Sequence, residues 1–263
     1  MSDTSESSLP TNVRVLLPGV PARSSRGYLG FCAICAVSLG DDWLIFDTGQ
    51  HGDRLLLLEA MENAHIEREQ VKYVVLSHLH HDHVLNLPLF PHALVLVSAR
   101  ELSYARAVIA GKKTDTFIPD CLEALLAGRT IRTYDDTLDI DAHLHLFHVP
   151  GHTPGCTALR IEGQPPVVLC GDALKNSWEL ITRDPGLVLG SREDARNSIS
   201  LLAEQNAILV PGHDRPFKLI DGKVHPITSF SWSLTLDLYP RERNLRVVDI
   251  HQPISDTAPG TAG

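Results

Sequence analysis

Seven side chains of metal-binding type stand just beyond runs of apolar residues. They lie in four short motifs, "SHLHHDH", "VPGHTPG", "LCGDAL" and "VPGHDRP". The seven side chains are His78, His80, Asp82, His83, His152, Asp172 and His213. Imidazole nitrogen and carboxylate oxygen are ligands that borderline cations such as Zn²⁺ prefer. Seven such groups suffice for two metal ions with one carboxylate between them, whereas a solvated histidine-rich turn would explain only the first motif.

Such a pair of cations predicts hydrolytic chemistry. Two metal ions about 3.5 to 4 Å apart share a water, lower its pKa toward about 7 and hold the resulting hydroxide against an electrophile. One cation polarises the carbonyl or phosphoryl oxygen of the substrate, and the other receives the leaving atom. We expect Asp82, beside the hydroxide, to orient it and then carry its proton to the leaving group.

A cysteine offers an alternative nucleophile. Cys170 stands two residues before Asp172, but in an alternating strand that ends at Asp172 it is more typical of a packing residue. The sequence contains no Gly-x-Ser-x-Gly elbow and no glycine-rich phosphate loop. Attack by metal-held hydroxide is therefore the simplest chemistry that the residues support.

Short apolar runs separated by helical patterns position these groups. Strands are predicted at 13–17, 30–39, 43–49, 71–78, 93–99, 144–151, 156–161, 166–172 and 207–213. Helices are predicted at 53–65, 100–110, 119–127 and 191–205, the last with Ser191 as its N-cap. Cys32 and Cys35 fall inside a predicted buried strand, which favours packing over a redox or metal role. Two sheets packed face to face with helices outside would satisfy this order.

We divide the chain into three parts. Residues 1–11 are predicted to be disordered, because they are rich in Ser and Thr, and residues 12–225 form one hydrolase domain. Residues 226–263 form a C-terminal extension that is partly disordered at its end. The extension can cap the pocket, join a subunit interface or pack as an edge.

Composition and sequence pattern limit the expected cellular location and the expected classes of binding partner. The 263 residues carry a formal net charge of -9, which provides no general attraction for nucleic acid. No window approaches the roughly 20 apolar residues of a membrane span, and the N-terminus lacks the regions of a secretory signal. The odd number of cysteines, five, does not resemble a disulfide framework. We expect a cytoplasmic protein that acts on a small molecule, not on a membrane or a nucleic acid.

The motifs carry a family resemblance. "SHLHHDH" matches the His-x-His-x-Asp-His signature of the metallo-β-lactamase superfamily, and "PGHTPG", "GDA" and "PGHD" resemble its later ligand motifs in the same order. "IFDTG" at 45–49 is similar to the motif that precedes them. The resemblance covers roughly residues 13–220, and it implies an α+β fold, a four-layer αββα sandwich.

The resemblance also implies a role for each ligand. His78, His80 and His152 would hold one metal, while Asp82, His83 and His213 would hold the second; Asp172 would bridge them. Asp47 would be the supporting aspartate that orders the ligand loops by hydrogen bonding. The implied cofactor is two Zn²⁺ per chain, with Fe or Mn as the alternatives.

Members of the superfamily act on several substrate classes. The metal ligands therefore predict that water is activated, but they do not identify the substrate. The chain resembles acyl-homoserine lactonases in "PGHTPG", in length and in the spacing from Asp172 to His213. Those lactonases carry a tyrosine three places after the bridging aspartate, where this chain has Lys175. Lys175 would be catalytic and substrate-binding as a positive charge beside an oxyanion, or else a solvated loop residue. Trp178 is a second candidate for binding substrate, with a surface position as the alternative.

Other members of the superfamily give further hypotheses. The segment "HVLNLPLFPHALVLVS" resembles small animal metallo-β-lactamase-domain-containing proteins, a group linked to RNA phosphodiester cleavage. Against an RNA endonuclease or phosphodiesterase, the longest basic stretch is "GKK" at 111–113. "PGHT" and "GDAL" are shared with persulfide dioxygenases, which use one iron. β-Lactamase activity and a non-catalytic, metal-stabilised binding module complete the alternatives.

The sequence analysis thus predicts a dinuclear zinc-dependent hydrolase that cleaves an ester, lactone or thioester through a metal-bridging hydroxide. The acyl group, the physiological metal and the oligomeric state, a homodimer among the options, stay open.

Overall fold

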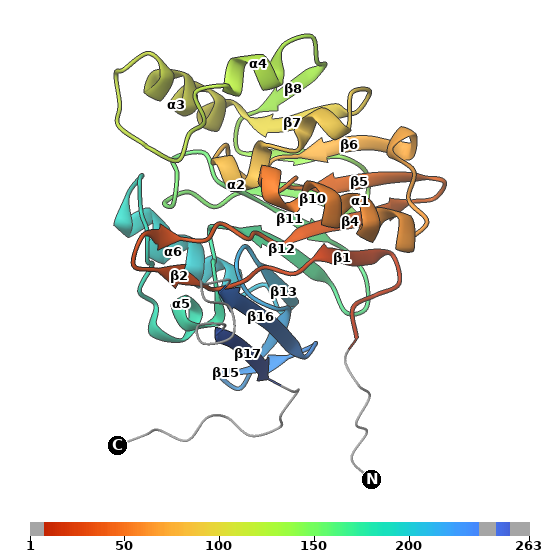
Figure 1. Cartoon of the computed structure of the whole chain (residues 1–263), viewed down its shortest axis with the longest axis vertical. Coiled ribbons are helices and arrows are strands. Elements are labelled where there is room, and N and C mark those ends of the chain that lie inside the picture. Colours follow the sequence, from red (N-terminus) through yellow and green to blue (C-terminus); the bar gives the residue numbers. More distant parts are fainter. Residues whose placement is uncertain (1–7, 237–245, 253–263) are drawn as a thin grey trace.

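Two β-sheets form the centre of the computed structural model, which describes residues 8–236 and 246–252 (Figure 1). The six-stranded sheet has the order β1-β4-β5-β6-β7-β8, and the seven-stranded sheet has the order β15-β14-β13-β12-β11-β10-β9. The strands of the first sheet are β1 (Val13–Leu17), β4 (Ile34–Leu39), β5 (Asp42–Phe46), β6 (Val71–Val75), β7 (Leu94–Ser98) and β8 (Ile131–Tyr134). Those of the second are β9 (Thr137–Asp139), β10 (Leu144–His148), β11 (Thr157–Ile161), β12 (Val167–Gly171), β13 (Ile208–Pro211), β14 (Phe217–Ile220) and β15 (Lys223–Pro226).

Helices cover the outer faces of both sheets. Buried residues of α1 (Arg54–Asn63), α3 (Ala99–Ile109) and α4 (Leu122–Leu126) pack against the first sheet. Buried residues of α5 (Ser177–Thr182) and α6 (Arg192–Ala203) pack against the second. One short helix, α2 (His81–Val84), and the 3₁₀ turns His51–Asp53, Arg68–Gln70 and Leu87–Leu89 lie in connecting segments of the first half.

The alternation of side chains along the strands explains the layers. In β12, Val167 and Leu169 belong to the apolar cluster between the sheets, whereas Val168 and Cys170 belong to the cluster under α5 and α6. Successive residues of a strand point to opposite faces of its sheet, so a fully apolar strand must be covered on both sides. The fold is the αββα sandwich that the resemblance implied.

The strand directions bring the ends of several strands to one edge. β5, β6, β7 and β8 are parallel neighbours, and β12 is parallel to β13. β10 runs in the same direction as β12, because each is antiparallel to β11. The loops that follow β5, β6, β10, β12 and β13 therefore leave the sandwich at the same edge, and these are the loops that carry the candidate ligands.

The predicted elements agree with the structure in kind and differ at their ends. Each of the nine predicted strands overlaps an observed one, but the strand predicted for 30–39 begins at Ile34, and the helix predicted for 119–127 shortens to Leu122–Leu126. Ser191 caps α6 as expected, its hydroxyl accepting the backbone N–H of Asp194 at 3.2 Å. The strands that the sequence did not predict include the short, exposed hairpin of β2 (Arg23–Ser24) and β3 (Gly27–Tyr28).

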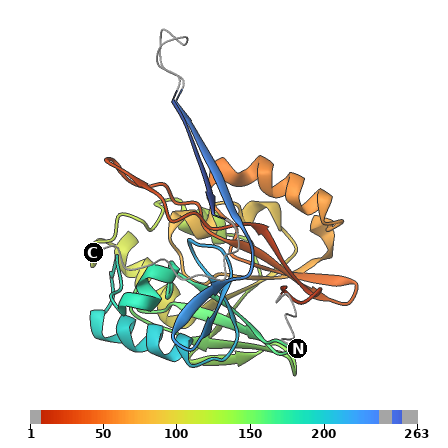
Figure 2. The same cartoon turned by 90° about the horizontal axis from the view of Figure 1, so that it is seen from below.

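The C-terminal extension begins with a hairpin. β16 (Phe230–Leu236) pairs with β17 (Arg246–Gln252), and Figure 2 shows the pair projecting from the body. Disorder is predicted for residues 1–11 and for the end of the extension; of these, 1–7 and 253–263 lie outside the described residues, whereas 8–11 lie within them. The division of the chain into parts stays a prediction. In the part of the chain that the structure describes, every helix is too short or too polar to cross a membrane.

Candidate metal centre

All seven predicted ligands come together at the shared edge of the two sheets. His78 and His80 lie in the loop between β6 and α2, and Asp82 and His83 lie on α2. His152, Asp172 and His213 follow β10, β12 and β13. The ligand atoms form three overlapping groups, in each of which the atoms lie within 4.8 Å of one another. We call His78, His80 and His152 the three-histidine group, and Asp82, His83 and His213 the mixed group.

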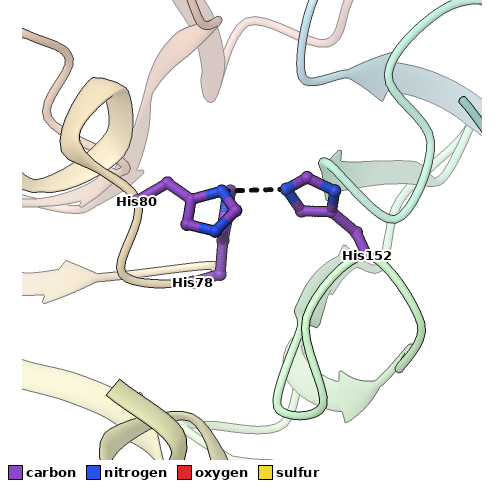
Figure 3. A group of neighbouring side chains, drawn as sticks. All are labelled: His78, His80 and His152. Carbon is purple, nitrogen blue, oxygen red and sulfur yellow. Dashed lines mark hydrogen bonds between the residues drawn. The ribbon is translucent and has the colours of Figure 1, made fainter. Parts of the chain in front are cut away.

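The three-histidine group joins the two halves of the sandwich (Figure 3). Nδ1 of His80 lies 3.0 Å from Nε2 of His152, and the rings of His78 and His80 stand edge to face with centroids 4.5 Å apart. Burial lowers the pKa of His78 well below its ordinary value, and the neighbouring imidazoles lower it further. The pKa of His152 is also lowered well below its ordinary value, first by burial and then by the positive charge of Lys175. These rings are therefore neutral and keep a lone pair for a cation.

Asp172 lies between the two groups. Its Oδ1 is 3.3 Å from Nε2 of His83 and 3.2 Å from Nε2 of His213, while its Oδ2 is 3.4 Å from Nε2 of His152. In the mixed group, Oδ2 of Asp82 lies 3.5 Å from Nε2 of His213. Burial disfavours charge on His213, yet the nearby Asp172 carboxylate raises the pKa of His213 above its ordinary value. One carboxylate thus presents a different oxygen to each group.

Unsatisfied polar atoms show that the cluster fits a cation. Four buried side-chain atoms in the described part of the chain have no hydrogen-bond partner, and three of them belong to this cluster: Nε2 of His78, Nε2 of His83 and Oδ1 of Asp172. Buried polar atoms are nearly always hydrogen-bonded, and an unpaired one needs an explanation such as an ion. The donors are imidazole nitrogen and carboxylate oxygen, which is a set that Zn²⁺ accepts.

The outward nitrogen of every histidine in the cluster has its own partner. The pairs are His78 Nδ1 with Ser77 Oγ at 3.0 Å, His80 Nε2 with Asp115 Oδ2 at 3.0 Å, His83 Nδ1 with Asp47 Oδ2 at 2.8 Å, His152 Nδ1 with the Leu187 carbonyl at 2.9 Å and His213 Nδ1 with the Phe31 carbonyl at 3.0 Å. Carboxylate and carbonyl oxygens only accept, and the Ser77 hydroxyl already donates to Asp47, so the outward nitrogen of each ring carries the proton and the inward one is free to coordinate.

Asp47 organises the loops of the first half. Its Oδ1 accepts the backbone N–H of Ser77 at 2.8 Å, and its Oδ2 accepts the Ser77 hydroxyl at 2.7 Å as well as Nδ1–H of His83. Asp47 has a φ of 58°, in the left-handed region, and is buried. A non-glycine residue in that conformation is held by its surroundings, and such residues concentrate at functional sites.

Two glycines are required because the ligand loops pass so close to one another. A Cβ on Gly171, whose φ is 50°, would lie 2.5 Å from Cβ of Ser77. A Cβ on Gly212 would lie 2.2 Å from Oδ1 of Asp172. The Gly in "CGDA" and in "PGHD" therefore leaves room for the neighbouring ligand loop and for the central carboxylate.

The sequence analysis missed a buried carboxylate that ties the two halves together. Glu101, in the first turn of α3, is fully buried. Its Oε1 accepts the backbone N–H of Leu79 at 3.0 Å, and its Oε2 accepts the Thr153 hydroxyl at 2.6 Å and the Gly155 N–H at 3.1 Å. An acidic residue near a helix start is ordinary in sequence, so only the tertiary contacts reveal that Glu101 joins the loop of His78 and His80 to that of His152.

The remaining candidates lie around the cluster. Lys175 is buried, and its ammonium contacts Oε1 of Glu179 at 3.1 Å and the Asp172 carbonyl at 3.3 Å. Trp178 on α5 is 70% exposed. Their catalytic and substrate-binding roles stay predictions. Cys170 is completely buried, and burial raises the pKa of its thiol far above the ordinary value, as expected for a packing residue.

Comparison with known proteins settles the family. A family model described as the metallo-beta-lactamase superfamily matches residues 28–213. The chain belongs to the metallo-β-lactamase superfamily. It is a metal-dependent hydrolase of this superfamily's fold, with a His and Asp cluster that could hold metal.

Relatives from this superfamily cover most of the chain. Metallo-beta-lactamase domain-containing protein 1 of Xenopus laevis is 29% identical over 220 residues, which is 80% of this chain and 83% of the relative. N-acyl homoserine lactonase AttM of Rhizobium radiobacter is 31% identical over 208 residues, 73% of each chain. The solved structure of AidC, described as a dizinc quorum-quenching lactonase, matches with a TM-score of 0.60 at 20% identity, covering 86% of this chain and 81% of AidC. The predicted family and fold are confirmed.

Proposed function

We propose that this metallo-β-lactamase-fold protein is a dinuclear zinc-dependent hydrolase that cleaves an ester, lactone or thioester bond of a small molecule. The observation that supports it most is the position of Asp172, which presents Oδ1 to His83 and His213 and Oδ2 to His152. In this proposal one cation is held by the three-histidine group and a second by the mixed group, with Asp172 shared between them. Two bound cations supply Lewis acidity, which lowers the pKa of water and polarises a carbonyl oxygen.

The chain's own side chains then handle protons and orientation. Asp82 faces His83 and His213 with its Oδ2, at 3.8 and 3.5 Å, and is 8% exposed. It is therefore placed to accept a proton from the attacking water and pass it to the leaving group. The five outward hydrogen bonds of the histidines keep their lone pairs directed at the centre while this happens.

The ammonium of Lys175 has less freedom to move than that of a solvent-exposed loop lysine. Because its ammonium is paired with Glu179 behind Asp172, we propose that it acts as a positive charge near His152 and Asp172 and does not move to the substrate. Trp178, the exposed second residue of α5, is the proposed apolar contact for an acyl group.

The relatives support the substrate class, and the burial of three described thiols supports attack by water over attack by cysteine. AttM, at 31% identity, is named as an N-acyl homoserine lactonase. The thiols of Cys32, Cys156 and Cys170 are buried, and burial raises the pKa of each. All five cysteines are free of disulfides, which supports our further proposal of a reducing, cytoplasmic setting.

The test combines metal analysis with a substrate panel. Purified protein is analysed for metals and then assayed with lactone, ester, thioester, β-lactam, phosphodiester and persulfide substrates. About two zinc equivalents with turnover of a lactone, ester or thioester would support the proposal. One iron with oxygen uptake on a persulfide, or turnover confined to phosphodiesters, would overturn it.

A further inference from the structure

Another buried carboxylate outside the seven ligands, Asp115, lies in the loop between α3 and α4. Asp115 is 6% exposed, and both of its oxygens are engaged. Oδ2 accepts Nε2–H of His80 at 3.0 Å and the Tyr104 hydroxyl at 2.8 Å, and Oδ1 accepts the backbone N–H of Phe117 at 2.9 Å. The carboxylate is thus fixed on three sides and aimed at one histidine of the three-histidine group.

His80 differs from the other histidines in the nitrogen that it turns inward. Four of the five histidines in the cluster turn Nε2 toward the centre, whereas His80 turns Nδ1 inward and Nε2 outward to Asp115. A neutral imidazole carries its proton on only one nitrogen, and an ionised carboxylate can only accept. The contact with Asp115 therefore places the proton of His80 on Nε2 and leaves the lone pair on Nδ1, 3.0 Å from Nε2 of His152.

The loop of Asp115 also restrains the plane of the His80 ring. The ring of Phe117 lies against that of His80, with centroids 5.3 Å apart and a 42° angle between the planes. The Phe117 carbonyl accepts the backbone N–H of His81 at 2.8 Å, which ties the loop to the start of α2. Asp115 and Phe117 together leave the His80 ring one orientation, and in that orientation Nδ1 faces the cluster.

We propose that Asp115 is a positioning residue that selects the Nε2–H tautomer of His80 and so makes the three-histidine group able to hold a cation. The inference rests on the proposed two-metal function. A purely structural role is the alternative, because the bonds from Tyr104 and Phe117 alone would give Asp115 a place in packing. The two roles predict different results for the tautomer of His80 and for the zinc affinity of each of the two metal positions.

The first experiment compares zinc binding by the full-length wild type, Asp115→Asn and Tyr104→Phe, using titration with a competing chelator. The asparagine amide can donate to Nε2 of His80, which would move the ring proton to Nδ1 and block coordination there. We expect Asp115→Asn to bind zinc about 10- to 100-fold more weakly at one of two positions, with the other unchanged. Tyr104→Phe removes the other side-chain donor to the same oxygen and should keep both affinities.

The outcomes separate the two proposals. A wild type with two zinc equivalents and an Asp115→Asn variant with unchanged affinities would refute the inference alone, as would equal weakening at both positions. A wild type that binds no zinc would refute the proposed function, and the inference with it.

A second measurement needs no variant, so it does not depend on how a mutant folds. Long-range ¹H–¹⁵N spectra of the metal-free wild type, at a pH of about 8 where imidazoles are neutral, report which ring nitrogen carries the proton. We expect a protonated Nε2 and an unprotonated Nδ1 for His80. The opposite tautomer would refute the role of Asp115.

Discussion

The three-histidine group and the mixed group are neighbours, but they present a cation with different surroundings. In the three-histidine group, burial lowers the pKa of His78 and His152. The mixed group contains a carboxylate, and burial there is outweighed by Asp172 and other negative groups, so the pKa of His213 is raised. The first group therefore has no carboxylate of its own and shares that of Asp172, whereas the second group also contains Asp82.

Different carboxylates stand directly behind the two groups, while Asp47 also supports His78 through the Ser77 hydroxyl. The mixed group depends on Asp47, which follows β5 in the first sheet and accepts His83 Nδ1–H. The three-histidine group depends on Asp115 and Glu101, both from the segment that begins with α3. Since neutral ligands bind only through the correct tautomer and geometry, we expect the three-histidine group to be the more sensitive to its outer partners.

Removal of the shared carboxylate should have the largest effect. Asp172→Ala takes the only common ligand from both groups, so we expect zinc content to fall at both positions and activity to fall by at least about 10³-fold. Metal analysis and turnover of the best panel substrate provide the measurement. The matched control is Asp139→Ala, whose side chain is 76% exposed on β9 and should change neither. Retention of two zinc equivalents by Asp172→Ala would contradict the shared position.

Single ligand variants separate the two groups. His80→Ala should lose the zinc of the three-histidine group and His213→Ala that of the mixed group, each leaving about one equivalent. Activity should fall more than about 100-fold in both, because even outer partners account for 10- to 100-fold. Chelator titration of each variant gives the affinity of the position that remains. If both variants retained the same position, the division into two groups would be wrong.

Asp47→Asn tests the support of the mixed group. The amide cannot accept all three donors that Asp47 now satisfies, from Ser77 N–H, Ser77 O–H and His83 Nδ1–H. We expect the free energy of unfolding of the metal-free protein to fall by about 2 to 4 kcal/mol. Urea denaturation measures this, and zinc titration should show weakening at the position that Asp115→Asn leaves unchanged.

Glu101→Gln should have a smaller effect. The amide keeps one acceptor oxygen but turns an NH₂ group toward a backbone N–H, at a cost of about 1 to 3 kcal/mol in unfolding free energy. Glu123→Gln is the control, because Glu123 is half-exposed and pairs with Arg106 on the surface, where such pairs contribute about 0 to 1 kcal/mol. Equal losses in the two variants by urea denaturation would argue against Glu101 as a brace between the ligand loops.

Cys170→Ala should change least. The thiol is buried among apolar residues under α5 and α6, so its removal should cost on the order of 1 kcal/mol in packing. Zinc content and turnover should stay within about twofold of wild type. A variant that keeps two zinc equivalents but is inactive would instead identify Cys170 as the nucleophile.

The apolar strands and the ligand motifs could be predicted because they leave local patterns. An uninterrupted run such as "VVLCG" predicts a buried strand, and a Gly–Asp or Gly–His pair after it predicts a side chain presented at the sheet edge. β2 and β3 have no such pattern, since two-residue strands with exposed side chains bury nothing that could be recognised. Glu101 and Asp115 were missed for a related reason: an isolated acidic residue has no periodicity.

The sequence by itself therefore determined the family, the order of the nine predicted strands and four predicted helices, and the seven side chains that the fold gathers. Each of these leaves a pattern in residues that are neighbours along the chain. Only the tertiary structure decided which nitrogen of each histidine faces inward, which oxygen of Asp172 serves each group and which carboxylates stand behind the ligands. Most of those features depend on contacts across 22 to 182 positions of sequence, such as Glu101 with Leu79 and His213 with Phe31. Hydrogen bonds over such separations form only when the tertiary structure has formed.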